Sequence, residues 1–211
     1  MAKVGIINYG IGNVRSVENA IKHTGHEVGS IICSSDFPKF EVVILPGVGA
    51  FGKCAEKLIK NELCEGLNQL ASGSQKLIGI CVGHQLFYEG SDESVNAIGM
   101  GFYRGKVQHL SSLPAKQEQK QALQFPNVGY RNVHAMPDNV ELPNGLLQER
   151  FYFVHSYGAH ADEDENCVAY TTYGGRKISA ISRNKNIISF QFHPERSREF
   201  GLRLLNWAIN T

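Results

Sequence analysis

The sequence predicts an α/β fold: a three-layer sandwich with a mostly parallel central sheet, helices on both faces and an antiparallel extension. Up to Cys81, short apolar runs alternate with helix-like segments, which is the pattern of parallel strands joined by crossover helices. After Cys81, strand-like runs follow one another with short turns between them, and such runs favour antiparallel pairing. The first half therefore predicts the parallel core and the second half its extension.

The expected elements of the first half follow from periodicity and from turn residues. Asn13 is placed to cap a helix that runs to about His23. A second helical stretch, 53–70, is expected to break near Asn61. The expected strands are the apolar runs 4–8, 27–32, 41–45 and 77–81. These strands alternate with the helices, as a parallel sheet requires.

The second half is expected to consist mainly of strands. We expect strands at 102–108, 128–135, 151–155, 167–173, 178–182 and 187–192. An amphipathic helix, 198–210, ends the chain. Two polar stretches, 111–124 and the four acids 162–165, are expected to be solvated loops. Without an internal repeat or a linker, we expect one domain over 1–211.

Composition excludes several classes of protein. Hydrophobic residues make up 42% and charged residues 19%, which are ordinary values for a soluble globular chain. The net charge of +1 gives no electrostatic reason to expect nucleic acid or an anionic membrane as partner. No apolar run approaches the roughly 20 residues of a membrane span, and the start has no pattern of an export signal. We therefore expect a cytoplasmic protein.

Cysteine usage agrees with a reducing compartment. The number of cysteines is odd and no pair has the C-x-x-C spacing, so we expect reduced thiols and neither a disulfide framework nor a metal site. Four of the five are expected to be inert: Cys33, Cys54, Cys64 and Cys167.

Cys81 is the candidate nucleophile. It lies in Gly79-Ile80-Cys81-Val82-Gly83, where an apolar strand ends and a helix is expected to open. This is the G-x-nucleophile-x-G turn with cysteine in place of serine. A glycine two residues to either side removes side chains that would clash in the strained turn. The backbone N–H groups at the start of the helix favour the thiolate.

His193 is the candidate base and Glu195 its orienting group. Both belong to Phe190-Gln191-Phe192-His193-Pro194-Glu195, at the end of an apolar strand. Pro194 restricts His193 to an extended conformation, and residues two apart in extended chain project to the same side. Glu195 can therefore reach the imidazole of His193. Of the other histidines, His155 could line the site, the role of His84 is open, and the rest are expected to be structural.

The loop Gly47-Val48-Gly49-Ala50-Phe51-Gly52 allows two interpretations. It matches G-x-G-x-x-G after a strand and before a helix, which is typical of a dinucleotide site. However, the next strand ends in Cys81 and supplies no acid for a ribose. The alternative is that N–H groups of Val48 or Gly49, together with that of Val82, form an oxyanion hole.

Three segments together resemble the class I glutamine amidotransferase family: PGVGAFG at 46–52, GICVGHQ at 79–85 and FQFHPE at 190–195. The resemblance covers essentially the whole chain, and it implies the fold of that family with no cofactor and no metal. It implies that Cys81 attacks the side-chain amide of glutamine and that His193, oriented by Glu195, protonates the leaving ammonia. A glutamyl thioester is then hydrolysed to glutamate.

Further segments are similar to one branch of that family, the glutaminase subunits of histidine biosynthesis: 8–13, 151–157 and HPERS at 193–197. In that branch ammonia passes to a (β/α)8-barrel cyclase, so the resemblance implies a heterodimer. The implied glutamine pocket consists of Gly49, Gln85, Glu93, Ser156 and Tyr157. Asn13 and Arg196 are implied to face the cyclase.

The chain departs from the branch at Gly129-Tyr130-Arg131, where Gly-Trp-Asn is usual. This departure leaves open which molecule accepts the ammonia. The alternative acceptor is a sugar that is amidinated in surface-polysaccharide synthesis, supplied by a similar paralogue. A cysteine hydrolase and a non-catalytic binding subunit are alternatives of other classes. A cysteine hydrolase would need Cys81 and His193 but not the pocket of Gln85 and Glu93 or a partner surface. A non-catalytic binding subunit would have a broken Cys–His–Glu set, whereas the set is intact in this sequence.

Overall fold

The computed structural model of the chain describes residues 1–115, 123–137, 142, 145, 147 and 149–211. Its centre is an eight-stranded sheet in the order β2-β1-β3-β4-β13-β12-β11-β8. The strands are β1 (Lys3–Ile7), β2 (Glu27–Ile31), β3 (Val42–Gly47), β4 (Lys76–Cys81), β8 (His134–Ala135), β11 (Cys167–Tyr173), β12 (Arg176–Asn184) and β13 (Ile187–Phe190). The five strands from β2 to β13 pair in parallel, and β12, β11 and β8 continue the sheet antiparallel. The predicted α/β class is confirmed.

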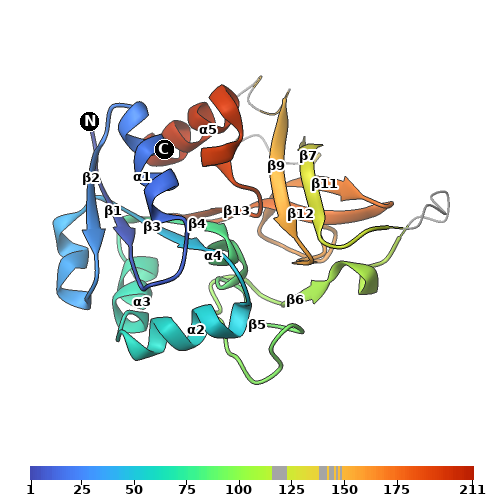
Figure 1. The fold of residues 1–211 in the computed structure, drawn as a ribbon, viewed down its shortest axis with the longest axis horizontal. Coiled ribbons are helices and arrows are strands. Elements are labelled where there is room, and N and C mark those ends of the chain that lie inside the picture. Colours follow the sequence, from blue (N-terminus) through green and yellow to red (C-terminus); the bar gives the residue numbers. More distant parts are fainter. Residues whose placement is uncertain (116–122, 138–141, 143–144, 146, 148) are drawn as a thin grey trace.

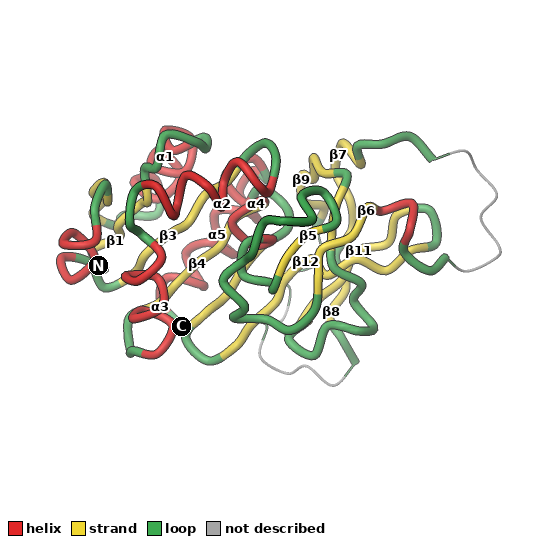
Figure 2. Tube along the Cα trace, turned by 90° about the horizontal axis from the view of Figure 1, so that it is seen from below, coloured by secondary structure: helices red, strands yellow, loops and turns green. Residues whose placement is uncertain are grey.

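Helices cover both faces of the parallel half (Figure 1). α1 (Val14–His23) and α5 (Arg198–Asn210) lie on one face, and α2 (Phe51–Lys60) and α3 (Cys64–Ser72) lie on the other. The sheet between them is enclosed, because all six residues of β3 are buried. A continuous apolar run such as that of β3 is what a strand covered on both faces requires. Figure 2 shows the helical layers around β1, β3 and β4, with the strand-rich part at the other end.

The extension differs from the expectation in which strands it contains. β13 was expected in the antiparallel part, but it pairs in parallel with β4. β7 (Asn127–Asn132) and β9 (Arg150–His155) pair only with each other and form a separate ribbon. β6 (Lys106–His109) joins β5 (Gly90–Ser91) and β10 (Tyr157–Gly158) in a small three-stranded sheet. Residue propensity predicts that a segment is extended, but packing decides its partner.

One local prediction is wrong, and a second is confirmed only in its position. The strand expected from Phe102 begins only at Lys106, because Gly101 and Gly105 adopt positive φ and turn the chain. Asn13 occupies the N-cap position of α1, but its side chain makes no capping hydrogen bond to the residues described.

The acidic stretch 162–165 is not uniformly solvated. Asp164 is only 7% exposed. Its Oδ2 accepts hydrogen bonds from Tyr88 Oη at 2.6 Å and Ser182 Oγ at 2.8 Å. These two donors replace water for the buried carboxylate. The other polar stretch, 111–124, falls partly outside the described residues, and within its described part Leu113 is buried.

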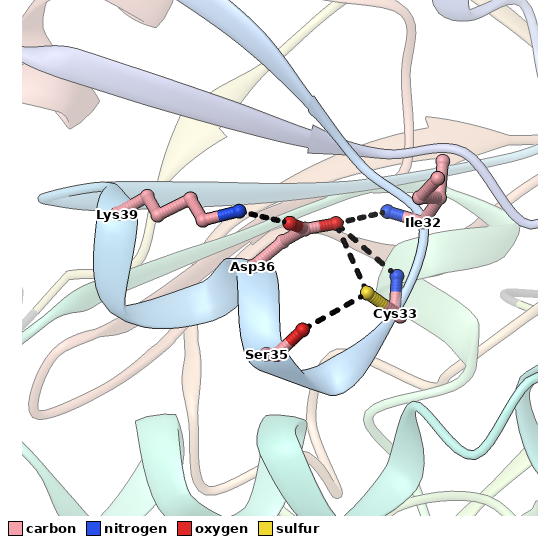
Figure 3. A network of polar contacts seen from close by, with 5 residues as sticks. All are labelled: Ile32, Cys33, Ser35, Asp36 and Lys39. Carbon is pink, nitrogen blue, oxygen red and sulfur yellow. Dashed lines mark hydrogen bonds and ion pairs between the residues drawn. The ribbon is translucent and has the colours of Figure 1, made fainter.

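The connection between β2 and β3 is organised by one carboxylate (Figure 3). This connection contains the short 3-10 helix η1 (Ser34–Lys39). Asp36 accepts hydrogen bonds from the backbone N–H groups of Ile32 and Cys33 and forms an ion pair with Lys39. These contacts, with that of Lys39 the largest, lower the pKa of Asp36. The Cys33 thiol is 3.4 Å from the same carboxylate, so local turn geometry accounts for this exposed cysteine.

Candidate active site

Cys81 lies at the tip of a sharp turn between β4 and the single-turn helix α4 (Val82–Gln85). Its φ of 56° and ψ of −109° place it outside the regions that L-residues ordinarily adopt. The helix ends at Gln85, and a single turn supplies a smaller dipole than a long helix. Strained backbone at a potential nucleophile is typical of a functional site.

The two glycines around Cys81 are sterically required. A Cβ at Gly83 would lie 1.9 Å from the carbonyl oxygen of Leu45, and a Cβ at Gly79 would lie 2.6 Å from the ring of Phe87. Because the first contact is with backbone, β3 would have to move to relieve it. Glycine at 83 therefore lets β3 and the turn pack directly against each other.

His193 and Glu195 form a buried pair just after β13. His193 donates its backbone N–H to the Tyr152 carbonyl, which ties the end of this segment to β9. Glu195 belongs to the short 3-10 helix η3 (Pro194–Arg196), and its Oε1 lies 2.7 Å from Nδ1 of His193. This bond places the proton on Nδ1 in the neutral ring. Nε2 of His193 has no hydrogen-bond partner among the described residues.

The pKa of His193 is raised to about 10. Burial, the largest single influence, lowers it, but the interactions with Cys81 and Glu195 together outweigh burial. These interactions favour the protonated form of the His193 imidazole. A protonated imidazole beside a sulfur is the arrangement that stabilises a thiolate.

A cleft of about 320 Å³ lies where these elements meet. It is lined by Val48, Gly49, Cys81, Val82, Gln85, Glu93, Pro126, Val154, His155, Ser156, Tyr157 and His193. The fold thus gathers residues from the glycine loop, the cysteine turn, β9 and the end of β13. The lining includes all the predicted oxyanion and glutamine-pocket residues, and Glu195 lies behind His193.

The glycine loop packs directly on the cysteine turn. A Cβ at Gly47 would lie 2.8 Å from the Cβ of Val82, so the two segments touch. Tyr9 donates its hydroxyl to the Pro46 carbonyl at 2.9 Å, and burial raises the pKa of this phenol well above its usual value. The Val48 carbonyl faces the Cys54 thiol at 3.6 Å. In a trans peptide, the N–H of Gly49 points the opposite way.

Hydrogen bonds at the start of α2 disfavour a dinucleotide site in this loop. A pyrophosphate would need free N–H groups at the start of α2. Glu93 Oε2 already accepts from Phe51 N at 2.7 Å, and Ser94 Oγ already accepts from Gly52 N at 3.2 Å. The G-x-G-x-x-G interpretation fails because side chains from the 93–94 segment satisfy these donors.

Gln85 has a fixed orientation at the cleft. Its Nε2 donates to the Tyr157 carbonyl at 2.9 Å and to Gln191 Oε1 at 3.1 Å. A carbonyl can only accept, so the atom of Gln85 that faces it is the nitrogen. The Gln85 side-chain oxygen therefore remains as the acceptor of the amide.

The structure brings in residues that sequence reasoning missed. Asn127 and Arg131 on β7 connect to His155 in the cleft wall. Tyr130 donates its hydroxyl to the Arg196 carbonyl at 3.0 Å. The guanidinium of Arg196 lies 4.3 Å from the ring centre of Tyr152. The only sequence feature that pointed here was the departure at Tyr130-Arg131.

Two predicted positions lie outside the cleft wall. Asn13 and Arg196 are both exposed, as a contact with a partner would require. His84, whose role was open, is fully buried, and its Nδ1 lies 2.7 Å from Ser189 Oγ. Burial and the nearby His155 lower the pKa of His84 to about 3, so it is a neutral core residue.

Neither a metal cluster nor a spanning helix is found in the part of the chain that the structure describes. No group of three or more His, Cys, Asp or Glu side chains there could hold a metal ion. No helix formed by those residues is long and apolar enough to cross a membrane.

Comparison with known proteins defines the class. The sequence profile of the class-I glutamine amidotransferase family matches residues 5–209, and the chain belongs to this family. It is a glutamine amidotransferase by family, with the α/β fold that the family shares.

Two solved structures have the same fold. One, titled as a glutamine amidotransferase, has a TM-score of 0.69 at 16% identity, covering 98% of this chain and 97% of its own. The other, PurLQS from Thermotoga maritima, has a TM-score of 0.71 at 18% identity, covering 100% and 99%.

Curated relatives give a narrower comparison. The chain is 40% identical to the imidazole glycerol phosphate synthase subunit HisH of Methanopyrus kandleri, over 98% of this chain and 97% of the relative. It is 34% identical to the protein of the same name from Prochlorococcus marinus, over 100% and 99%. The similarity therefore extends over the whole length of both relatives.

Proposed function

We propose that this chain is the glutaminase subunit of imidazole glycerol phosphate synthase. It hydrolyses glutamine to glutamate and passes the ammonia to a (β/α)8-barrel cyclase subunit in histidine biosynthesis. The observation that carries the proposal is the cleft where Cys81, His193 and the predicted glutamine pocket meet. The full-length similarity to subunits with that name supports the choice of pathway.

In the proposed reaction, the Cys81 thiolate attacks the side-chain amide carbon of glutamine. The His193 imidazolium then donates its proton to the departing nitrogen, so ammonia leaves and a glutamyl thioester remains. Neutral His193 next takes a proton from water, whose oxygen attacks the thioester. Breaking the C–S bond releases glutamate and regenerates the thiolate and the imidazolium. Glu195 keeps His193 in one tautomer throughout.

The negative oxygen of each tetrahedral intermediate needs N–H donors. We assign this role to the backbone of Val82 with that of Val48 or Gly49, because the glycine loop and the cysteine turn are in contact beside Cys81. We assign glutamine binding to Gly49, Gln85, Glu93, Ser156 and Tyr157, which line the same cleft. The acceptor oxygen of Gln85 suits the α-ammonium group of the substrate.

The exposed Asn13 and Arg196 are the proposed contacts with the cyclase. Arg196 directly follows Glu195, so a partner bound there would touch the segment that orients His193. The odd number of cysteines, without any C-x-x-C spacing, supports a reducing, cytoplasmic setting. The continuous central sheet, which takes strands from both halves of the sequence, supports one domain over 1–211.

The experiment measures glutamate release from glutamine by the chain alone, with the cyclase, and with the cyclase plus its nucleotide substrate. We expect a low rate alone and a large rise in the last mixture. Cys81→Ser should abolish the activity, whereas Cys64→Ser, a matched control in α3 outside the cleft lining, should retain it. Glutaminase activity without any response to this cyclase would overturn the pathway and favour the sugar-amidination paralogue. Labelling of Cys81 by peptide-like electrophiles alone would favour a cysteine hydrolase.

A further inference from the structure

A series of hydrogen bonds runs from the β7–β9 ribbon to the wall of the cleft. Arg131 Nε donates to Asn127 Oδ1 at 3.0 Å. Asn127 Nδ2 lies 3.2 Å from His155 Nε2, and His155 Nδ1 lies 2.8 Å from the Tyr157 carbonyl. The same carbonyl accepts from Gln85 Nε2 at 2.9 Å. This Arg131–Gln85 series links a surface strand to a residue of the glutamine pocket.

The donors and acceptors of the series have only one consistent direction. The Tyr157 carbonyl can only accept, so Nδ1 of His155 carries the hydrogen. In a neutral ring Nε2 is then an acceptor, and it must receive the amide hydrogen of Asn127. The guanidinium of Arg131 can only donate, so it selects the oxygen of Asn127 and turns the amide nitrogen toward His155.

His155 is suited to this role because it stays neutral. Burial, chiefly, lowers its pKa to about 4, and the charges of His193 and Arg131 act in the same direction. Asn127 is completely buried. Arg131 holds this amide from one end, and the Tyr157 carbonyl, through the hydrogen on Nδ1 of His155, favours the same orientation from the other. Without a donor at Arg131, only the second restraint remains. A reversed amide would present oxygen to Nε2 and favour the other tautomer of His155.

Arg131 itself is well anchored. Its guanidinium lies 5.2 Å from the ring centre of Tyr173, and its NH2 donates to the Val128 carbonyl at 3.3 Å. These contacts reduce the entropy that Arg131 loses in pointing Nε at Asn127. Arg131 is also one of the positions where the sequence departs from the Gly-Trp-Asn pattern, so the hydrogen bond from Arg131 to Asn127 depends on a residue that differs from that pattern.

We propose that Arg131 is a positioning residue of the glutamine pocket, which acts through Asn127 and His155 on the Tyr157 carbonyl and thereby on Gln85. The inference rests on the proposed glutaminase function. Arg131 touches neither the sulfur nor the base, so its loss should weaken glutamine binding more than the chemical step. Loss of one hydrogen bond corresponds to a rise of about 3- to 10-fold in KM, with kcat changed far less.

The test compares Arg131→Met, which keeps an unbranched stem as far as the position of Nε and removes every donor, with Arg131→Lys, which keeps a donor and the charge. Asn127→Asp is the second variant: it can still accept from Arg131 but cannot donate to His155. Arg150→Met is the matched control, because Arg150 on the neighbouring strand donates to the Tyr130 carbonyl at 2.6 Å outside the series. Each protein is assayed with the cyclase for kcat and KM, and the ¹⁵N resonances of His155 report its tautomer.

We expect the Nδ1–H tautomer of His155 in the wild-type protein and in Arg150→Met. Arg131→Met should shift His155 toward Nε2–H, and Asn127→Asp should place a hydrogen on Nε2 that faces the new carboxylate. Both variants should raise KM, and Arg131→Lys should show smaller changes than Arg131→Met in both readouts. An unchanged tautomer in Arg131→Met and Asn127→Asp would overturn the inference, even if KM rose. A wild-type protein without glutaminase activity would instead overturn the proposed function, and the tautomer would still test the series.

Discussion

At the scale of single residues, His193 is governed by two opposing influences. Burial disfavours its charged form, whereas Glu195 and Cys81 favour it, and the second influence prevails. The second carboxylate oxygen of Glu195, Oε2, has no hydrogen-bond partner among the described residues. Such an isolated buried carboxylate is costly unless its interaction with the imidazolium compensates.

Replacing Glu195→Gln should therefore lower kcat by about 100-fold or more while KM changes little, because the substitution removes the charge and the acceptor that orient His193. The pKa of His193 should fall, since Glu195 contributes to raising it. Steady-state kinetics with glutamine and an NMR titration of His193 check the two effects. Glu199→Gln, an exposed glutamate in the first turn of α5, is the control. Unchanged glutamine hydrolysis in Glu195→Gln would show that Glu195 is not the orienting group.

At the scale of elements, the turn between β4 and α4 depends on close backbone packing. Gly83 lets the turn lie directly against the Leu45 carbonyl of β3. The parallel pairing of β3 with β4 extends through Gly47 and Cys81. The glycine loop and the cysteine are thus held side by side by the sheet itself.

Gly83→Ala should destabilise the fold by about 1–3 kcal/mol, because the added methyl overlaps backbone that can move only if β3 moves. It should also reduce glutaminase activity through displacement of the turn. Urea unfolding measures the first effect. In Gly90→Ala, the methyl would lie 3.5 Å from its nearest neighbour, the oxygen of the Ala97 carbonyl. The free energy of unfolding should therefore fall much less in this control. Equal stabilities of the two variants would contradict the importance of the close contact.

At the scale of the whole molecule, buried histidines couple folding to pH. Burial lowers the pKa of His84 to about 3 and that of His155 to about 4. Both are neutral in the folded protein, whereas the unfolded chain binds protons below about pH 6.5. Their contribution to stability is therefore present above that pH and is lost as the pH falls.

The free energy of unfolding should thus decrease between about pH 6.5 and 4.5, by about 1.4 kcal/mol per pH unit for each histidine once it is below its unfolded pKa. His193 adds little to this slope: its raised pKa keeps it protonated in the folded protein, and below its ordinary pKa of about 6.5 the unfolded chain protonates it as well. Urea unfolding across this range measures the slope. His84→Asn should flatten it, whereas His23→Asn, at an exposed position, should not. A slope that His84→Asn leaves unchanged would rule out His84 as a source of the dependence.

The sequence was most informative where local chemistry and global packing agree. The bounds of the last helix match the prediction, because its apolar spacing both favours a helix and faces the core. The cysteine turn and the His-Pro-Glu segment were predicted for the same reason, since each is determined by residues within a few positions. These segments also carry the resemblance that defines the family.

Pairing between distant segments was beyond the sequence. β13 lies beside β4 in parallel, and β7 leaves the central sheet to pair with β9. An extended segment can pair on either side and in either direction, and only the packing of the complete core selects one arrangement. Asp164 illustrates this at one side chain: among four consecutive acids it alone reaches Tyr88 and Ser182.

By itself, the sequence determined the α/β class, the candidate nucleophile, its base and the orienting acid, because these depend on periodicity and on short spacings. Tertiary structure alone decided that Arg131 and Asn127 connect with His155 at the cleft, and that Glu93 and Ser94 cap the glycine-loop helix. Those contacts join segments far apart along the chain. Hydrogen bonds of this kind are specific only when folding has excluded water and brought donor and acceptor into alignment.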